Sequence, residues 1–192
     1  MKILSICGSP RKGNSEAVLF KIQKLLKQQG VENEIILLRK KRIKRCEGCV
    51  EYCNKELECQ IQDDMKQIMK EMEEADAIIF ISPNYFQMPT GLFKDFIDRC
   101  SIFYTKMCAT GKNILKNKKA VVIGVGADNV ANIDVCTDII ANNFCKGLEF
   151  NVVAKQSFKS KSELKGNHNS IFESNLNPDI QKDIEKLVEK LI

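Results

Sequence analysis

The fold is decided by the stretch KILSICGSPRKGNSEAVLFKIQKLL, residues 2–26. Its first part, residues 2–7, is a short apolar run, which predicts a β-strand. Apolar residues then recur at helical spacing: Val18, Ile22, Leu25 and Leu26. Gly30 supplies a stop signal for this helix. The stretch therefore predicts a strand that passes through a glycine-containing loop into an amphipathic helix.

The rest of the chain alternates between the same two patterns. Continuous apolar runs predict buried strands at 77–81 and 120–123, and shorter runs predict strands at 34–38 and 150–153. Apolar periodicity predicts helices at 63–74, 91–104 and 133–145, and a last helix with Asn177 as its N-cap, Pro178 at its first position and an apolar stripe reaching Leu191. Strands that alternate with helices predict an α/β, doubly wound parallel sheet, with ligands beyond the carboxyl ends of its strands.

Size and composition limit the possible functions. A chain of 192 residues with 44% hydrophobic residues is the size of one well-buried domain, so we expect a single domain over residues 1–192. The net charge is only +5, and residues 39–45, Arg-Lys-Lys-Arg-Ile-Lys-Arg, carry much of it. This run predicts a solvated loop or a surface that attracts an anionic redox partner or the extra phosphate of NADPH. It lacks the features of a nucleic-acid-reading module. No apolar run reaches the ~18 residues of a membrane span and no signal peptide is recognisable, so we expect a cytoplasmic protein without a membrane partner.

The loop after the first strand has the features of a phosphate site. Its glycines and serines offer backbone N–H and hydroxyl donors at a helix N-terminus, where the helix dipole favours an anion, and Arg11 adds a positive charge. A nucleoside-triphosphate loop needs a lysine where Asn14 stands, and the Gly-x-Gly-x-x-Gly of a dinucleotide loop is absent. Cys7 and Arg11 are too close for the Cys-x5-Arg of a small tyrosine phosphatase. The phosphate of a mononucleotide is favoured, with an ordinary strand-to-helix turn as the alternative.

Four of the nine cysteines lie close together, with the spacing Cys46-x2-Cys49-x3-Cys53-x5-Cys59. In a reducing compartment such a group indicates a metal-binding or redox-active site rather than disulfides. The spacing leaves a [4Fe-4S] cluster, a structural zinc ion or unliganded thiols, and the cluster is favoured because zinc ribbons pair two Cys-x2-Cys knuckles across a long gap. The remaining five cysteines are expected to be buried: Cys7, Cys100, Cys108, Cys136 and Cys145.

Several stretches together resemble the NAD(P)H-dependent FMN reductase family of flavodoxin-like proteins. Residues 8–15 look like its FMN-phosphate loop, Ser82-Pro83-Asn84-Tyr85-Phe86 looks like its flavin-ring loop, and residues 91–99 are similar to the helix that follows. The cysteine segment, which ends in Cys59-x3-Asp63-Asp64-Met65, further resembles the iron-sulfur flavoprotein branch, in which FMN is paired with a [4Fe-4S] cluster. The resemblance covers about residues 1–126.

This resemblance implies the flavodoxin-like strand order 2-1-3-4-5 and a cysteine-rich insertion at about residues 39–62. It also implies an FMN site made by three loops and a cluster held by the four cysteines. The predicted FMN-binding residues are Ser9, Arg11, Lys12, Gly13, Asn14, Ser15, Glu16, Pro83, Asn84, Tyr85, Phe86, Gly124 and Gly126. The predicted cluster ligands are Cys46, Cys49, Cys53 and Cys59. The chain departs from the branch pattern at Val50-Glu51-Tyr52, where the branch has two residues between its second and third cysteines.

We therefore expect an FMN-containing oxidoreductase that transfers electrons between a [4Fe-4S] cluster, FMN and a donor such as NAD(P)H or ferredoxin, and that forms a homodimer or homotetramer. No catalytic side chain is expected, because the cofactors carry the chemistry. One alternative is a cluster-free NAD(P)H-dependent FMN or quinone reductase. An alternative of another class is a non-catalytic thiol or zinc redox regulator.

Overall fold

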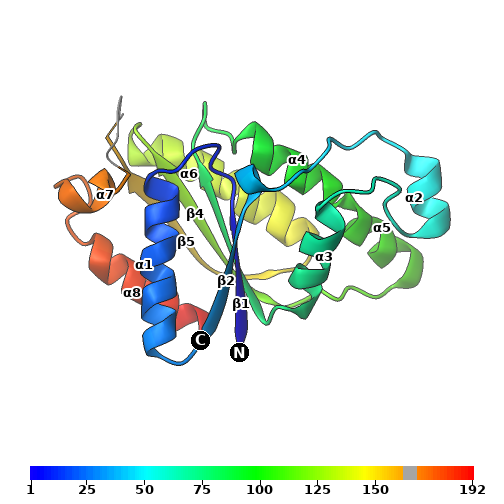
Figure 1. The fold of residues 1–192 in the computed structure, drawn as a ribbon, viewed down its shortest axis with the longest axis horizontal. Helices are drawn as coiled ribbons and strands as arrows, with labels where there is room; N and C mark the ends of the chain where they lie inside the picture. Colours follow the sequence, from blue (N-terminus) through cyan, green and yellow to red (C-terminus); the bar gives the residue numbers. More distant parts are fainter. Residues whose placement is uncertain (162–167) are drawn as a thin grey trace.

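A five-stranded parallel sheet lies at the centre of the computed structural model, which describes residues 1–161 and 168–192 (Figure 1). The strands follow the order β2-β1-β3-β4-β5, which confirms the predicted doubly wound, flavodoxin-like topology. Their bounds are β1 (Lys2–Cys7), β2 (Glu32–Leu37), β3 (Ala77–Pro83), β4 (Lys119–Gly126) and β5 (Asn151–Lys159). The chain order reverses between β1 and β3, so a ligand crevice is expected beyond the carboxyl ends of these two strands.

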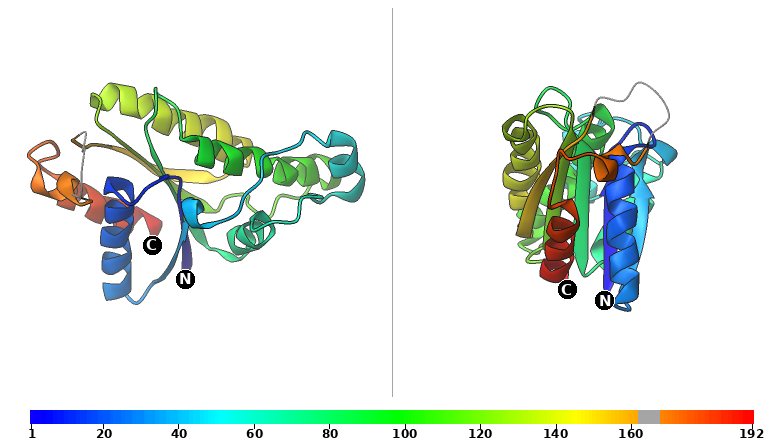
Figure 2. Two further views of the ribbon diagram at one scale, coloured as in Figure 1. Left: turned by 45° about the horizontal axis from the view of Figure 1, so that its top comes forward. Right: turned by 90° about the vertical axis from the view of Figure 1, so that its left-hand side faces the viewer.

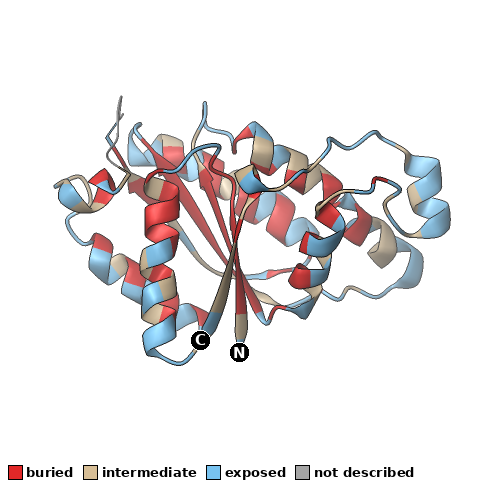
Figure 3. Ribbon diagram, viewed as in Figure 1, coloured by how far each residue is buried: buried red, intermediate tan, exposed pale blue. Residues whose placement is uncertain are grey.

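The central strands bury side chains on both faces. Leu4, Ile6, Ile78 and Phe80 face one apolar layer, and Ile3, Cys7, Ile79 and Ile81 face the other. Such strands have no solvated face, which is why they are almost continuously apolar in sequence. Figure 3 shows the resulting concentration of buried residues in the sheet.

Helices cover both faces of the sheet (Figure 2). One face carries α1 (Asn14–Gln28) and α8 (Ile180–Leu191), which pack against each other. The opposite face carries α3 (Met65–Glu74), α4 (Gly91–Arg99), α5 (Ser101–Thr110) and α6 (Val130–Asp138), which continues as the π-helical segment η2 (Ile139–Cys145). At the centre of this second face, the ring of Phe80 lies 5.3 to 6.4 Å from four other phenylalanine rings: Phe93, Phe96, Phe144 and Phe150. This cluster fixes the position of α4 on the sheet. Within the described part of the chain, no helix has the length and apolar character needed to cross a membrane.

Several predicted bounds are corrected by the structure. The helix predicted over 91–104 is two helices, because Cys100 has ψ −8° and its N–H bonds to two carbonyls, so the first helix tightens and ends there. The strand predicted at 150–153 continues to Lys159, since its pairing with β4 extends beyond the apolar run. The last helix begins at Ile180 rather than Pro178. Asn177 does not cap it, because its Oδ1 accepts the backbone N–H of Lys159 at 3.0 Å.

The segment between β2 and α3 leaves the layers of the sheet. After the short 3-10 helix η1 (Leu38–Lys40), it forms an exposed lobe around α2 (Val50–Glu56), which lies against α5 at one end of the molecule (Figure 1). We call residues 44–63 the cysteine lobe. No residue of α2 is buried (Figure 3), so this helix carries no apolar stripe that a sequence pattern could reveal. A single-turn helix, α7 (Ser170–Glu173), lies between β5 and α8.

Candidate functional site

A cavity of about 220 Å³ lies at the carboxyl ends of the parallel strands. Four loops supply its lining: Ser9, Arg11, Gly13, Asn14, Ser15, Pro83, Asn84, Tyr85, Val125, Gly126, Ala127, Ser160 and Lys161. All three loops predicted to bind FMN are therefore brought together. Four predicted residues lie outside this lining: Lys12, Glu16, Phe86 and Gly124.

Gly8 fixes the path of the loop after β1. Its N–H donates to the carbonyl of Ile81 at 2.9 Å, and its own carbonyl accepts the Thr90 hydroxyl at 2.6 Å. A Cβ at Gly8 would lie 2.6 Å from the side chain of Phe93, which is fully buried. Only glycine fits at this close approach. Thr90, which also accepts the N–H of Phe93, is an anchor of the loop that the sequence did not reveal.

The N-terminus of α1 opens on the cavity without a side-chain cap. Gly13 occupies the N-cap position, and no side chain in the described part of the protein caps the first turn. The first N–H groups of an α-helix have no partner within the helix, so these donors are available to a ligand. The Ser9 hydroxyl donates to the carbonyl of Arg11 at 2.7 Å and thereby holds the loop. Ser15 is buried beside the cavity, and Arg11 lines it from an exposed position. This arrangement can bind an anion.

Two predicted residues of this loop have side chains that are engaged elsewhere. The amide of Asn14 donates to the Ser170 hydroxyl at 3.2 Å and accepts the N–H of Ile171 at 3.1 Å, so it joins α1 to α7. The carboxylate of Glu16 is buried and lies 2.6 Å from the guanidinium of Arg39. Part of the basic run is therefore inside the protein, where it neutralises a carboxylate.

The loop after β3 ends in an unusual tight turn. The backbone groups of Tyr85 and Met88 exchange two hydrogen bonds of 3.0 Å, and the two residues between them have positive φ angles, 53° at Phe86 and 63° at Gln87. Glycine and asparagine are the usual residues of such turns. The Phe86 side chain is 101% exposed, so in this structure it faces solvent and not the cavity.

Asn84 provides a free acceptor at the base of the same loop. Its N–H donates to the carbonyl of Val125 at 2.7 Å, which joins the β3 loop to β4. Its side-chain Oδ1 is buried and has no hydrogen-bond partner among residues 1–161 and 168–192. A buried acceptor without a donor is costly, so this atom calls for a ligand that carries an N–H or O–H group.

The loops after β4 and β5 complete the cavity. A Cβ at Gly126 would lie 3.0 Å from Asn84, and the Gly126 carbonyl accepts the N–H of Ser160 at 2.7 Å. A Cβ at Gly124 would instead clash with Thr137 of α6, so this glycine allows α6 to pack closely on β4. Ser160 and its neighbour Lys161 were missed by the sequence prediction, because β5 was expected to end before them.

The four clustered cysteines all lie in the cysteine lobe. Cys49 and Cys53 lie on one face of α2, with their Sγ atoms 3.7 Å apart, because residues four apart are neighbours on a helix. Burial raises the pKa of Cys53 to about 11, and the contact with Cys49 and the charges of Cys59 and Cys46 add to this effect. Among the described residues, however, no three His, Cys, Asp or Glu side chains are close enough to surround one metal ion.

The donor set of the lobe is compatible with an iron-sulfur cluster. Four cysteines are the usual ligands of a [4Fe-4S] cluster, and each would bind a different iron, so the sulfurs need not converge on one point. Of the five scattered cysteines, four are buried as expected, and burial raises the pKa of Cys7 to about 11 and that of Cys136 to about 12. Cys108 is the exception, since it is exposed on α5.

Comparisons with known proteins agree with this geometry. Residues 1–162 match the family described as NADPH-dependent FMN reductase. An iron-sulfur flavoprotein from Methanocaldococcus jannaschii is 34% identical over 145 residues, which is 75% of this chain and 72% of the relative. An iron-sulfur flavoprotein from Archaeoglobus fulgidus is 40% identical over 118 residues, which is 62% of this chain but only 55% of that relative's length.

Solved structures share the fold at low sequence identity. NAD(P)H:quinone oxidoreductase from Methanothermobacter marburgensis superposes with a TM-score of 0.69 at 17% identity, over 97% of this chain and 96% of the other. The flavoenzyme NAD(P)H:acceptor oxidoreductase from Paracoccus denitrificans gives a TM-score of 0.64 at 17% identity, over 99% and 96% of the two chains. The sequence matches and this topology together place the chain in the NADPH-dependent FMN reductase family, within its iron-sulfur flavoprotein branch.

Proposed function

We propose that this chain is an FMN-dependent oxidoreductase that also carries a [4Fe-4S] cluster and transfers electrons between the cluster, FMN and an external donor such as NAD(P)H or ferredoxin. The observation that carries the proposal is the crevice cavity, in which an uncapped helix N-terminus and the unpartnered Asn84 Oδ1 meet. The first suits a phosphate and the second suits a polar N–H or O–H group of the same ligand. Four thiols on the same chain supply the second redox site.

The residues of the crevice divide the binding of FMN between them. The N–H groups at the start of α1, the Ser15 hydroxyl and the Arg11 guanidinium would hold the phosphate, because each is a hydrogen-bond donor. Asn84 would accept a hydrogen bond from the flavin, and Tyr85 would supply an aromatic contact to it. When FMN is bound, it accepts hydride or single electrons itself, so the protein needs no general acid or base at this site. Glu16, which lies outside the cavity lining, would act indirectly by holding Arg39.

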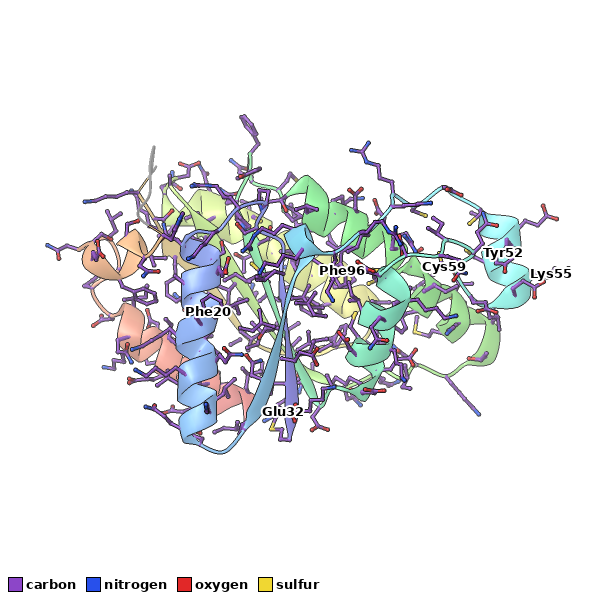
Figure 4. All side chains as sticks on the ribbon, in the orientation of Figure 1. Phe20, Glu32, Tyr52, Lys55, Cys59 and Phe96 are labelled. Carbon is purple, nitrogen blue, oxygen red and sulfur yellow. The ribbon has the colours of Figure 1, made fainter. Side chains whose placement is uncertain are left out.

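Cys46, Cys49, Cys53 and Cys59 would hold the cluster, which supplies one-electron transfer. The cysteine lobe lies at one end of the molecule, where Figure 4 places Tyr52 and Cys59, whereas Phe20 of α1 lies on the other side of the sheet's centre in this view. Apolar side chains are exposed both on α2, at Val50 and Tyr52, and on the β3 loop, at Phe86. We propose that a homodimer or homotetramer covers these surfaces and brings a lobe to a flavin. The reducing cytoplasm is the compartment that suits its free thiols.

Analysis of one anaerobic preparation tests the proposal. We expect a flavin spectrum, FMN released on denaturation, and iron and sulfide in equal amounts. Cys49→Ser should lose iron and sulfide but keep FMN, whereas the matched Cys108→Ser on exposed α5 should keep both. A protein that neither retains nor takes up FMN would refute the flavin site.

A second candidate is a cluster-free NAD(P)H-dependent FMN or quinone reductase. The three residues between Cys49 and Cys53, where the iron-sulfur flavoprotein branch has two, favour it, because the additional residue rotates the third thiol relative to the second. Yellow protein that oxidises NADPH but contains no iron would support this candidate, and colourless protein that contains zinc would support a thiol or zinc regulator.

A further inference from the structure

A buried ion pair lies at the base of the cysteine lobe. The guanidinium of Arg99, on α4, contacts the carboxylate of Asp63 through two parallel hydrogen bonds, Nη1 to Oδ2 at 2.7 Å and Nη2 to Oδ1 at 3.1 Å. The side chains of Arg99 and Asp63 are 1% and 0% exposed. Desolvation makes such a pair a poor source of stability compared with apolar packing, so its position needs another explanation.

The pair joins the two ends of the cysteine lobe. Arg99 Nη1 also donates to the carbonyl of Lys44 at 2.8 Å, and Asp63 Oδ2 accepts the N–H of Lys44 at 2.8 Å. Lys44 precedes the first of the four cysteines and Asp63 follows the last. Arg99 itself belongs to α4, which the phenylalanine cluster fixes on the sheet. Both ends of the lobe are therefore held at one rigid point.

The guanidinium of Arg99 also lies near Cys59, the last of the four clustered cysteines. Arg99 Nη2 lies 3.5 Å from the carbonyl of Ile61, two residues after Cys59. Among the residues that the structure describes, the buried Arg99 Nε has no hydrogen-bond partner. Cys59 and Asp63 line the same cavity of about 470 Å³ between α3 and α5. A buried cation thus lies near the last cysteine of the lobe.

We propose that Arg99 is a positioning residue for the iron-sulfur cluster, which holds the cysteine lobe closed and raises the reduction potential of the cluster. This inference rests on the proposed function, because it requires a cluster on the four cysteines. Reduction adds one negative charge to the cluster, and a buried cation stabilises that charge. Asp63 has the opposite effect, so the two members of the pair act on the potential with opposite signs.

Single substitutions of the two partners test this inference by an anaerobic dithionite titration followed by electron paramagnetic resonance. Arg99→Gln should lower the equilibrium constant for one-electron reduction of the cluster at least tenfold, a shift of about 59 mV to lower potential. Asp63→Asn should shift the potential upwards. The control is Arg45→Gln, which removes the same charge next to Cys46, but from a side chain that is 88% exposed and screened by water. The reduction potential of the cluster in Arg45→Gln should stay near that in the unmodified protein.

A purely structural role predicts a different pattern, because both substitutions would then lower the iron content and neither would move the potential of the cluster that remains. That result would overturn the inference. If Arg99→Gln assembles no cluster, the reduction potential of the cluster in Asp63→Asn decides the test. A potential that is unchanged or lower than in the unmodified protein would contradict the assigned charge effect. Unmodified protein with FMN but without iron and sulfide would instead refute the proposed function, and the inference with it.

The positioning role has a separate readout that needs no cluster. In cluster-free protein loaded with FMN, hydrogen exchange of the Lys44 amide should become faster in Arg99→Gln, because Asp63 is then no longer held in place. Arg45→Gln should leave this exchange unchanged. Equal protection of Lys44 in both variants would show that Arg99 does not hold the lobe.

Discussion

Substitution of Gly8 by alanine tests the close approach that positions the phosphate loop. The added Cβ would lie 2.6 Å from Phe93 Cβ and Cδ2, whereas carbon atoms in contact are about 3.5–4.0 Å apart, so the overlap is about 1 Å. Phe93 cannot move freely, because it is fully buried against Phe80 and Phe96. Overpacking of this kind costs about 1–3 kcal/mol. In a chain of this size that corresponds to a fall of about 2–12 °C in Tm.

The assay is thermal unfolding of the FMN-free protein together with FMN titration, and Gly13→Ala is the matched control. A Cβ at Gly13 would meet no atom within 4 Å, and its φ of 178° is extended backbone that alanine adopts. Gly13→Ala should therefore change the free energy of unfolding by less than about 0.5 kcal/mol. The substitution should nevertheless weaken the binding of FMN, because Gly13 lines the cavity. Equal stability of the two variants would refute the packing argument, and unchanged FMN affinity in both would refute the proposed site.

Three further predictions concern buried charges and thiols. Arg39→Ala should lower the free energy of unfolding by about 3–5 kcal/mol in urea denaturation, because it leaves the Glu16 carboxylate buried without a partner. Burial alone would raise the pKa of Asp63, yet the hydrogen bonds to its carboxylate lower it, so the folded state releases this proton more readily than the unfolded state. The ionised Asp63 carboxylate should therefore add to the free energy of unfolding above about pH 4, and this contribution should be lost as the pH falls further. Asp63→Asn should remove this contribution to the pH dependence of the free energy of unfolding. In cluster-free folded protein, iodoacetamide should label Cys46 and Cys108 first by mass spectrometry, because both are exposed, whereas prior labelling of the buried thiols would contradict the packing.

The sheet could be predicted from the sequence because its central strands have a strong local signal. β1 and β3 are buried on both faces, so most of their residues are apolar, and the polar Ser5 and Ser82 are buried with them. β5 is an edge strand with several half-exposed residues, and its apolar pattern fades after Val153. Its true end was therefore missed, and with it the contribution of Ser160 and Lys161 to the cavity.

Long-range pairing explains the other differences from the sequence prediction. Asn177 has the sequence context of a helix cap, but its amide is used by β5 instead. Glu16 and Arg99 look like ordinary polar residues of amphipathic helices, yet each is buried against a partner from a distant segment. α2 gave no periodic signal because it buries no residue. The order of the motifs along the chain was sufficient to predict which loops meet at the cavity, whereas the contacts of each side chain depended on pairings that only the folded chain creates.

The anchoring of the cysteine lobe at Lys44 and Asp63 has an evolutionary consequence. Both ends of the cysteine lobe, at Lys44 and Asp63, are held by Arg99 of α4. A residue gained or lost between these two positions therefore changes only the length of a loop with fixed ends, and such a change costs little conformational entropy. The strand register and the cavity at the carboxyl ends of the strands are unaffected by such a change. The additional residue before Cys53 is a variation of this tolerated kind. The same logic makes the segment a natural candidate for grafting onto related reductases, provided that the recipient also receives the arginine and the aspartate at the junction.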